Sequence, residues 1–305
     1  MKNQILYTAL VTPFDESVVN VDYQSLEKLI RYQENAKNGI LLLGSTGESL
    51  SLSFKEKQEI INFVCNLKLN TEIVVGVPSC NIDSALELID FCNQMPISGY
   101  LMTTPIYTKP GEIGQTKWFE KLLDKSKYPS ILYNIPSRSG IKLNPQSVKN
   151  LSQHDKFFAI KDSGGSIENM YEYKVTAPNI LIYCGDDYMT NSMISEGAIG
   201  LISVASNALP KGMRKYLENA LLNKGNDESN QDFHQIFKAL FKASNPIPIK
   251  ALLNKIGLIL YKTTRLPLSA DDFNNLNELL SFYKKISVLE DESNKYQNIN
   301  SKKIK

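Results

Sequence analysis

A lysine directly follows a short apolar run near the middle of the chain. The run Phe157–Ile160 leads into Lys161, and Asp162-Ser163-Gly164-Gly165 comes next. Burial disfavours a charged ammonium, so an amine at the end of a buried strand favours its neutral form. A neutral amine can attack a carbonyl carbon and form an imine. Lys161 is therefore a candidate nucleophile, and the alternative is a structural lysine that reaches solvent or pairs with a carboxylate.

A tyrosine and an arginine follow the preceding apolar run. That run, Ile131–Tyr133, ends in Tyr133, and Arg138 lies in the loop Asn134–Gly140 that comes next. A phenol at a neighbouring strand end can relay protons to and from a carbinolamine. A guanidinium can hold a carboxylate through two parallel hydrogen bonds. The alternative is a rim tyrosine beside a surface arginine.

Three further segments place polar groups after apolar runs. The segment Gly44–Ser49 carries Ser45 and Thr46 between two glycines, and its hydroxyl and backbone N–H groups can bind a carboxylate or a phosphate. Tyr107 follows another run, and Gly185-Asp186-Asp187 follows a third. Each segment also has a structural interpretation: a plain turn, loop packing, or an aspartate that caps a helix.

Composition excludes several classes of protein. The net charge is +2 over 305 residues, so no strong field attracts nucleic acid or an anionic membrane. Two histidines and four scattered cysteines, none in a CxxC pair, argue against a metal site. No glycine-rich phosphate-binding motif follows a strand, so no phosphate-bearing cofactor is expected. No apolar run approaches the roughly 18 residues of a membrane span, and we expect a soluble cytoplasmic protein.

Short apolar runs alternate with amphipathic stretches over roughly the first two thirds of the chain. Each run has the length of a buried parallel strand. Helix start signals lie between them, such as a capping box at Ser53–Glu56 and the pair Asn144-Pro145. The eight runs are Tyr7–Val11, Ile40–Leu43, Ile73–Val77, Gly99–Met102, Ile131–Tyr133, Phe157–Ile160, Ile180–Cys184 and Ile199–Val204. Eight strand–helix units predict a closed (β/α)₈ barrel rather than a doubly wound open sheet.

The pattern changes from Leu209 onward. Four helices are predicted without an intervening strand: Pro210–Leu222, Asp232–Ala243, Ile249–Tyr261 and Asp271–Ile286. We interpret residues 1–208 as the barrel and residues 209–288 as a helical extension packed on it. Residues 289–305 are polar and rich in Lys, Asn and Ser, which predicts a frayed, flexible tail.

Several segments, in order from residue 5 to about residue 285, together resemble the pyruvate-dependent class I aldolase superfamily. They are Thr8–Phe14, Gly44-Ser45-Thr46-Gly47-Glu48, Tyr133-Asn134-Ile135-Pro136, Ile160-Lys161-Asp162 and Gly185-Asp186-Asp187. Within this superfamily the chain is most similar to the dihydrodipicolinate synthase family. The closer likeness is carried by Arg138, Asn245-Pro246-Ile247-Pro248-Ile249-Lys250 and Arg265-Leu266-Pro267-Leu268.

The resemblance implies a condensation of pyruvate with L-aspartate 4-semialdehyde, which gives 4-hydroxy-tetrahydrodipicolinate for lysine and diaminopimelate biosynthesis. Lys161 would form the imine with pyruvate, and Arg138 would hold the carboxylate of the semialdehyde. Gly185 and Ile202 would line the site through backbone groups. These roles require no metal and no cofactor.

The resemblance also implies a proton relay and an oligomer. Ser45 and Thr46 would bind the pyruvate carboxylate, and Thr46 would join Tyr133 and Tyr107 in the relay. Tyr107 would come from a neighbouring subunit, which implies at least a dimer and usually a tetramer built from dimers.

Other functions share this chemistry. The form Gly44-Ser45-Thr46-Gly47-Glu48 also occurs in sialate lyases, and many synthases have threonine in place of Ser45. An aldolase that releases pyruvate from N-acetylneuraminate or a 2-keto-3-deoxy sugar acid is therefore an alternative, although Arg138 argues against it. A remote alternative is a barrel that binds a keto acid without catalysis.

The resemblance implies a regulatory site for L-lysine, and this chain matches it incompletely. Ser49 and Asn81 match the site, but Ala85 falls where the family has a glutamate. Histidines of inhibited members and a tyrosine are replaced by Phe54, Lys57 and Ile106. We expect weak or absent feedback inhibition.

Overall fold

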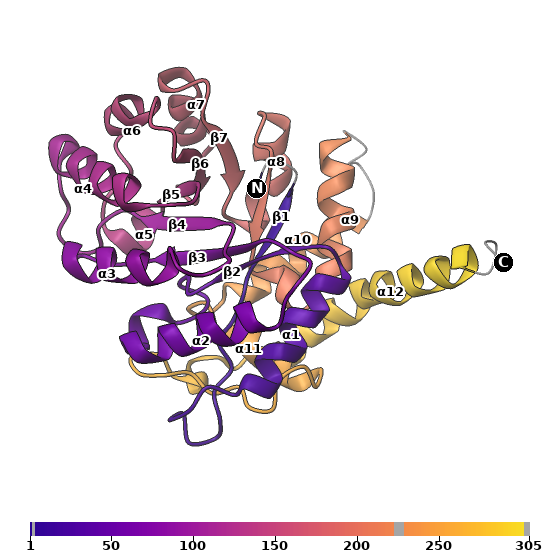
Figure 1. The fold of residues 1–305 in the computed structure, drawn as a ribbon. Coiled ribbons are helices and arrows are strands. Elements are labelled where there is room, and N and C mark those ends of the chain that lie inside the picture. Colours follow the sequence, from indigo (N-terminus) through magenta and orange to yellow (C-terminus); the bar gives the residue numbers. More distant parts are fainter. Residues whose placement is uncertain (2–3, 223–228, 302–305) are drawn as a thin grey trace.

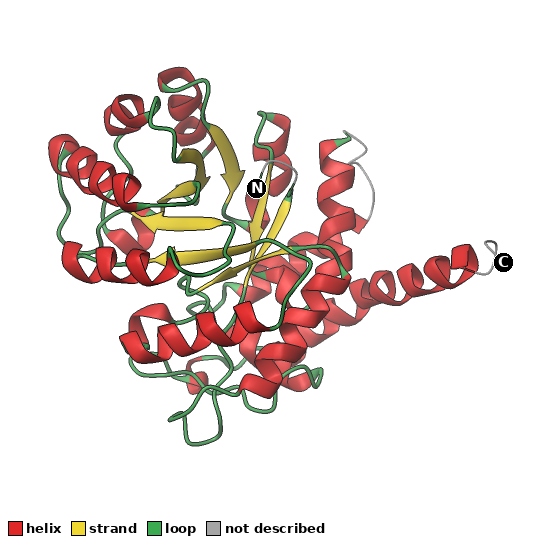
Figure 2. Cartoon of the chain, viewed as in Figure 1, coloured by secondary structure: helices red, strands yellow, loops and turns green. Residues whose placement is uncertain are grey.

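Eight parallel strands close into a barrel in a computed structural model that describes residues 1, 4–222 and 229–301. The strands pair in chain order, and β8 pairs back to β1. They are β1 (Leu6–Ala9), β2 (Gly39–Leu42), β3 (Ile73–Val77), β4 (Gly99–Thr103), β5 (Ser130–Asn134), β6 (Phe157–Asp162), β7 (Leu181–Cys184) and β8 (Gly200–Ser203) (Figure 2). The predicted (β/α)₈ barrel is confirmed, and every predicted strand is present with ends shifted by at most about two residues.

Helices follow each strand and surround the barrel (Figure 1). They are α1 (Tyr23–Asn35), α2 (Phe54–Asn66), α3 (Ile82–Cys92), α4 (Glu112–Lys125), α5 (Pro136–Ser139), α6 (Pro145–Leu151), α7 (Ile167–Thr176), α8 (Thr190–Ser195) and α9 (Pro210–Leu221). Short 3₁₀ helices are η1 (Ser49–Ser51), η2 (Asp187–Met189), η3 (Ala205–Asn207) and η4 (Ala270–Asp272). The predicted start signals are confirmed: Ser53 and Glu56 form a reciprocal capping box on α2, and the Asn144 side chain caps α6 ahead of Pro145.

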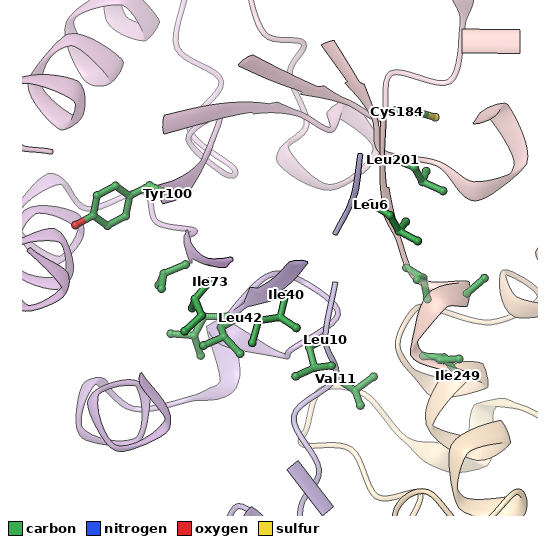
Figure 3. Close-up of a cluster of buried hydrophobic side chains, with 14 of the residues drawn as sticks. Leu6, Leu10, Val11, Ile40, Leu42, Ile73, Tyr100, Cys184, Leu201 and Ile249 are labelled. Atoms are coloured by element: carbon green, nitrogen blue, oxygen red, sulfur yellow. The ribbon is translucent and has the colours of Figure 1, made fainter. Parts of the chain in front are cut away.

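Two layers of apolar side chains hold the barrel together. The inner layer fills the barrel with residues from alternate strand positions, including Tyr7, Leu41, Ala159 and Ile202. The outer layer lies between strands and helices, and Figure 3 shows Leu6, Ile40 and Leu201 in it together with Ile249. Full burial of one such side chain contributes about 1.5–3 kcal/mol. Because Ile249 comes from the extension, barrel and extension share one core.

The helical extension continues with α10 (Ser229–Leu240), α11 (Ile247–Lys255) and α12 (Leu276–Ser301). The helix predicted over Ile249–Tyr261 is wrong at its end, because α11 stops at Lys255. Gly257 follows with φ of +76°, and the N–H groups of Gly257 and Leu258 bond back to the carbonyls of Asn254 and Leu253. This is a glycine-terminated helix end, which the sequence signals by Gly257 itself.

The bounds of the C-terminal helix also differ from the prediction. The helix predicted over Asp271–Ile286 begins at Leu276 and continues to Ser301, so it includes residues 289–301. The flexibility predicted for residues 289–305 stays a prediction. No proline or glycine interrupts this stretch, and buried Glu290 accepts hydrogen bonds from the N–H groups of Lys211 and Gly212 at the start of α9. Figure 1 shows α12 extending away from the barrel. Residues 302–305 lie outside the described residues, and the division at residue 209 stays a prediction.

Candidate active site

A cavity of about 340 Å³ opens at the carboxyl ends of the strands. Its walls come from the loops after β2, β3, β4 and β5 and from the extension, and they include Ser45, Tyr133, Arg138 and Pro267. This volume suits a small ligand. The position is the one at which (β/α)₈ barrels carry their active sites.

Lys161 and Tyr133 lie side by side on neighbouring strands. They are paired in the register of β5 and β6, and the Lys161 Nζ lies 4.2 Å from the centroid of the Tyr133 ring. Both side chains are 5% exposed. Among the described residues, no hydrogen bond or ion pair holds the Lys161 amine. Tyr133 lines the main cavity, whereas Lys161 does not, so the amine lies next to a residue of the cavity wall.

Gly185 gives Lys161 the space that it occupies. A Cβ atom at position 185 would lie 2.9 Å from Lys161 Cε and 2.1 Å from Ser163 Oγ, which is too close for either. The Gly185 N–H donates to the carbonyl of Asp162 at 2.8 Å.

Ile202 lies in the inner layer of the barrel with Tyr133 and is 1% exposed. Its side chain is therefore part of the apolar packing inside the barrel.

The loop after β2 is tightly bent around Ser45 and Thr46. Leu43 and Glu48, which flank it, both have positive φ angles. Gly76 on β3 makes room for this bend, because a Cβ there would approach the Leu43 carbonyl oxygen to 2.4 Å. Ser45 lines the cavity, while Thr46 is buried and its Oγ1 accepts a hydrogen bond from Asn245 Nδ2 at 2.9 Å.

Arg138 and Tyr107 lie further out, on the rim. Arg138 is exposed and lines both the main cavity and a second, shallower one of about 640 Å³ that includes Tyr107. Tyr107 is 90% exposed and has a φ angle of +68°. Its N–H donates to the Ser139 carbonyl at 3.1 Å. Within one chain, therefore, the Tyr107 side chain lies in solvent and does not join Thr46 and Tyr133.

Three carboxyl groups lie after or at the ends of β6 and β7, and burial raises the pKa of each. Asp162 accepts hydrogen bonds from Asn134 Nδ2 and the Gly164 N–H. Asp187 accepts from Ser203 Oγ and from the N–H groups of Val204 and Ala205, so it caps η3. Burial raises the pKa of Asp186 to about 6, and the positive charge of Lys161 opposes that rise. Asp187 thus has the structural role of a cap, and Asp186 is the acidic group left beside the amine.

Sequence reasoning missed two residues of the extension. Asn245 contacts Thr46 and Arg138, and Lys250 forms a fully buried ion pair with Glu48. Both lie in the segment Asn245–Lys250, which resembles the family. That resemblance is the sequence signal that could have identified them. In the part of the chain that the structure describes, no cluster of side chains could hold a metal ion, and no helix is long and apolar enough to span a membrane.

The fold and this cavity define a (β/α)₈ barrel of the enzyme type, with its polar groups at the carboxyl ends of the strands. The model of the dihydrodipicolinate synthetase family matches residues 2–286. The chain belongs to that family.

Individual relatives cover nearly the whole chain. The 4-hydroxy-tetrahydrodipicolinate synthase of Wolbachia pipientis from Culex pipiens is 52% identical over 286 residues, which are 94% of this chain and 97% of the relative. The solved 4-hydroxy-tetrahydrodipicolinate synthase of Methylacidiphilum fumariolicum has a TM-score of 0.86 at 31% identity, covering 94% of this chain and 98% of that one. The enzyme of Cyanidioschyzon merolae, solved with lysine bound, has a TM-score of 0.84 at 29% identity, covering 94% and 97%.

Proposed function

We propose that the chain is a 4-hydroxy-tetrahydrodipicolinate synthase, which condenses pyruvate with L-aspartate 4-semialdehyde. The observation that carries this proposal is the buried Lys161 amine beside the Tyr133 ring, at the mouth of a barrel whose relatives have this activity. The substrates are small molecules, and the proposal involves no nucleic acid, membrane, metal or cofactor. The free state of all four cysteines supports a cytoplasmic location.

The chemistry follows from the amine. Neutral Lys161 attacks the keto carbon of pyruvate, and loss of water from the carbinolamine gives an imine. The protonated imine withdraws electrons, so the pyruvate methyl loses a proton and an enamine forms. The enamine carbon attacks the aldehyde carbon of the semialdehyde. The amino group of that substrate then displaces Lys161 by transimination, which closes the ring and frees the lysine.

The remaining residues bind and transfer protons in this proposal. Ser45 and Thr46 hold the pyruvate carboxylate, and Tyr133 moves protons to and from the carbinolamine. Arg138 receives the carboxylate of the semialdehyde at the rim. The backbone of Gly185 and Ile202 lines the site. A pyruvate-releasing aldolase of sialic or sugar acids would share the imine but would not need Arg138 at this place.

Borohydride trapping tests the proposal. Reduction in the presence of pyruvate should leave a pyruvyl adduct on the peptide that contains Lys161, and mass spectrometry locates it. Lys161→Arg should abolish the adduct and nearly all activity, because a guanidinium stays protonated and cannot attack. An adduct on another lysine would contradict the mechanism. A substrate panel then separates a synthase, which consumes the semialdehyde, from an aldolase that releases pyruvate.

The proposal includes a homo-oligomer, a tetramer built from dimers, in which Tyr107 completes the site of a neighbouring copy. The 90% exposure of Tyr107 on the rim supports this arrangement. Mixing Lys161→Arg and Tyr107→Phe chains provides the test. Each chain alone should be nearly inactive, whereas mixed dimers should regain activity from one site that has both residues. No recovery after subunit exchange would place Tyr107 outside the partner's site.

A further inference from the structure

Asn245 connects the helical extension to two residues of the proposed site. It lies just before α11 and is 6% exposed. Its Nδ2 donates to Thr46 Oγ1 at 2.9 Å, and its main-chain carbonyl accepts from Arg138 Nη2 at 3.0 Å. Thr46 and Arg138 come from loops after different strands, β2 and β5. A single residue from outside the barrel therefore contacts both.

The contact with Asn245 restricts the Thr46 hydroxyl. A hydroxyl has one proton to donate and two lone pairs that accept. Asn245 Nδ2 occupies a lone pair, so the Thr46 proton must be donated in another direction. Among the described residues, no side chain or carbonyl accepts that proton. The Thr46 proton is therefore left for a ligand bound beside Thr46 or for a neighbouring phenol.

A buried ion pair holds the helix and the loop together. Lys250 of α11 is fully buried, pairs with Glu48 and donates to the Thr263 carbonyl at 2.9 Å. Glu48 lies two residues after Thr46, and its Oε2 accepts from the Arg265 N–H at 2.8 Å. Breaking such a pair would leave an uncompensated buried charge. The segment that carries Asn245 therefore cannot move independently of the loop that carries Thr46.

We propose that Asn245 is a positioning residue, which orients the Thr46 hydroxyl toward the reacting groups. This inference rests on the proposed function, because it assumes that Thr46 acts on pyruvate bound to Lys161. The Arg138 contact involves the main chain of Asn245 and persists when the side chain is removed. Truncation of Asn245 therefore affects turnover more than it affects binding of the aldehyde.

The test compares Asn245→Ala with a matched control, Asn254→Ala. Asn254 lies on the same helix and donates from Nδ2 to the Leu260 carbonyl at 2.7 Å, away from the site. We expect Asn245→Ala to lower kcat about tenfold, the order expected for one lost hydrogen bond, with the KM of the aldehyde changed by less than about twofold. Asn254→Ala should leave kcat within about twofold of the wild type while it lowers thermal stability.

A second variant, Asn245→Asp, keeps the shape of the side chain in case the alanine variant folds poorly. An ionised carboxylate accepts and cannot donate to Thr46, so it should lose at least as much turnover as alanine. Full activity of a folded Asn245→Ala or Asn245→Asp variant, or an equal loss in Asn254→Ala, overturns the inference. A wild-type chain that forms no pyruvate adduct on Lys161 overturns the proposed function instead, so the two failures are distinguishable.

Discussion

The guanidinium of Arg138 has most of its donors free for a ligand. Among the described residues, its side chain makes one hydrogen bond, to the Asn245 carbonyl, and no ion pair. A substrate carboxylate can therefore bind it through two parallel hydrogen bonds. Arg138→Ala should raise the KM of the aldehyde about 10- to 100-fold, corresponding to about 1.5–3 kcal/mol, with little change in the KM of pyruvate.

Steady-state kinetics with each substrate varied in turn measure this difference. Arg138→Lys is the matched control, because it keeps the charge but loses the planar pair of donors, so its KM should lie between those of the wild type and the alanine variant. Equal increases in both KM values would show that Arg138 supports the rim rather than binds the aldehyde.

Asp186 places a carboxyl group beside Lys161 at a cost in stability. Burial raises its pKa to about 6 in the folded chain, against an ordinary value of 3.8. The folded chain thus binds this proton more tightly than the unfolded chain does. Protonation of Asp186 therefore stabilises the folded chain. This stabilisation is complete below pH 3.8 and is lost as the pH rises through 6. At pH 7 the ionised group destabilises the fold by an amount on the order of 3 kcal/mol.

Asp186→Asn should therefore raise the free energy of unfolding at pH 7 by about 3 kcal/mol and leave it nearly unchanged at about pH 4. Urea unfolding at the two pH values measures the effect. Asp271→Asn, at an exposed position outside the site, is the control and should show no such pH-dependent gain. A variant that is equally stabilised at both pH values would mean that the effect of Asp186 does not come from its charge.

Elements defined by local pattern were predicted well from the sequence. A short apolar run between two helical stretches has few alternatives to a buried parallel strand, and all eight strands of the barrel were found. The errors lie at helix ends. Gly257 ends α11 early, and α12 continues through a polar stretch that composition alone marks as disordered. Buried Glu290 contacts the start of α9, and no pattern within α12 reveals that contact.

Arg265 lies in the extension and contacts three other elements: the loop that follows β1, the short helix η1, and α2. Its side chain donates to the carbonyls of Val18, Val19 and Ser51 and to Glu56. The hydrogen bond from Arg265 lowers the pKa of Glu56 to about 2, from an ordinary 4.5. A carboxyl with a depressed folded pKa stabilises the fold above pH 4.5, and this contribution is lost as the pH falls through 2.

Glu56→Gln should lower the free energy of unfolding at pH 6 by about 1 kcal/mol, a value reduced by solvent screening near the surface. The difference from the wild type should shrink as the pH falls from 5 toward 2, because both chains then carry a neutral side chain. Urea unfolding across this range measures it, with Glu59→Gln on the same helix as control. A difference that stays constant with pH would show that the capping geometry, rather than the charge, carries the effect.

Contacts between distant parts of the chain define the site at the scale of the whole molecule. Lys161 and Tyr133 could be paired from the sequence, because adjacent strands of a barrel bring their ends together. The contacts of Asn245 with Thr46 and of Lys250 with Glu48 join positions about two hundred residues apart. No periodicity or capping signal encodes such a separation. The extension therefore contributes to the candidate site, although its sequence shows only helices.

Regulation by L-lysine would couple a second ligand to this site. The family resemblance places that ligand near Ser49, Asn81 and Ala85. Ser49 lines the main cavity and its Oγ is buried without a partner among the described residues, but the Asn81 side chain is engaged as the cap of α3. Ala85 is buried and supplies no carboxylate for an ammonium, and Lys57 on α2 adds a positive charge.

We therefore expect L-lysine to inhibit this chain weakly or not at all, because its side-chain ammonium finds no carboxylate at this place. The measurement is a titration of L-lysine at saturating pyruvate, with L-norleucine, which lacks the side-chain ammonium, as control. Half-inhibition below about 1 mM, equivalent to roughly 4 kcal/mol of binding, would contradict this prediction if norleucine had no effect. Such affinity would require an acidic partner for the ammonium, and Asp83 and Glu87, on the same helix as Ala85, would be the residues to replace.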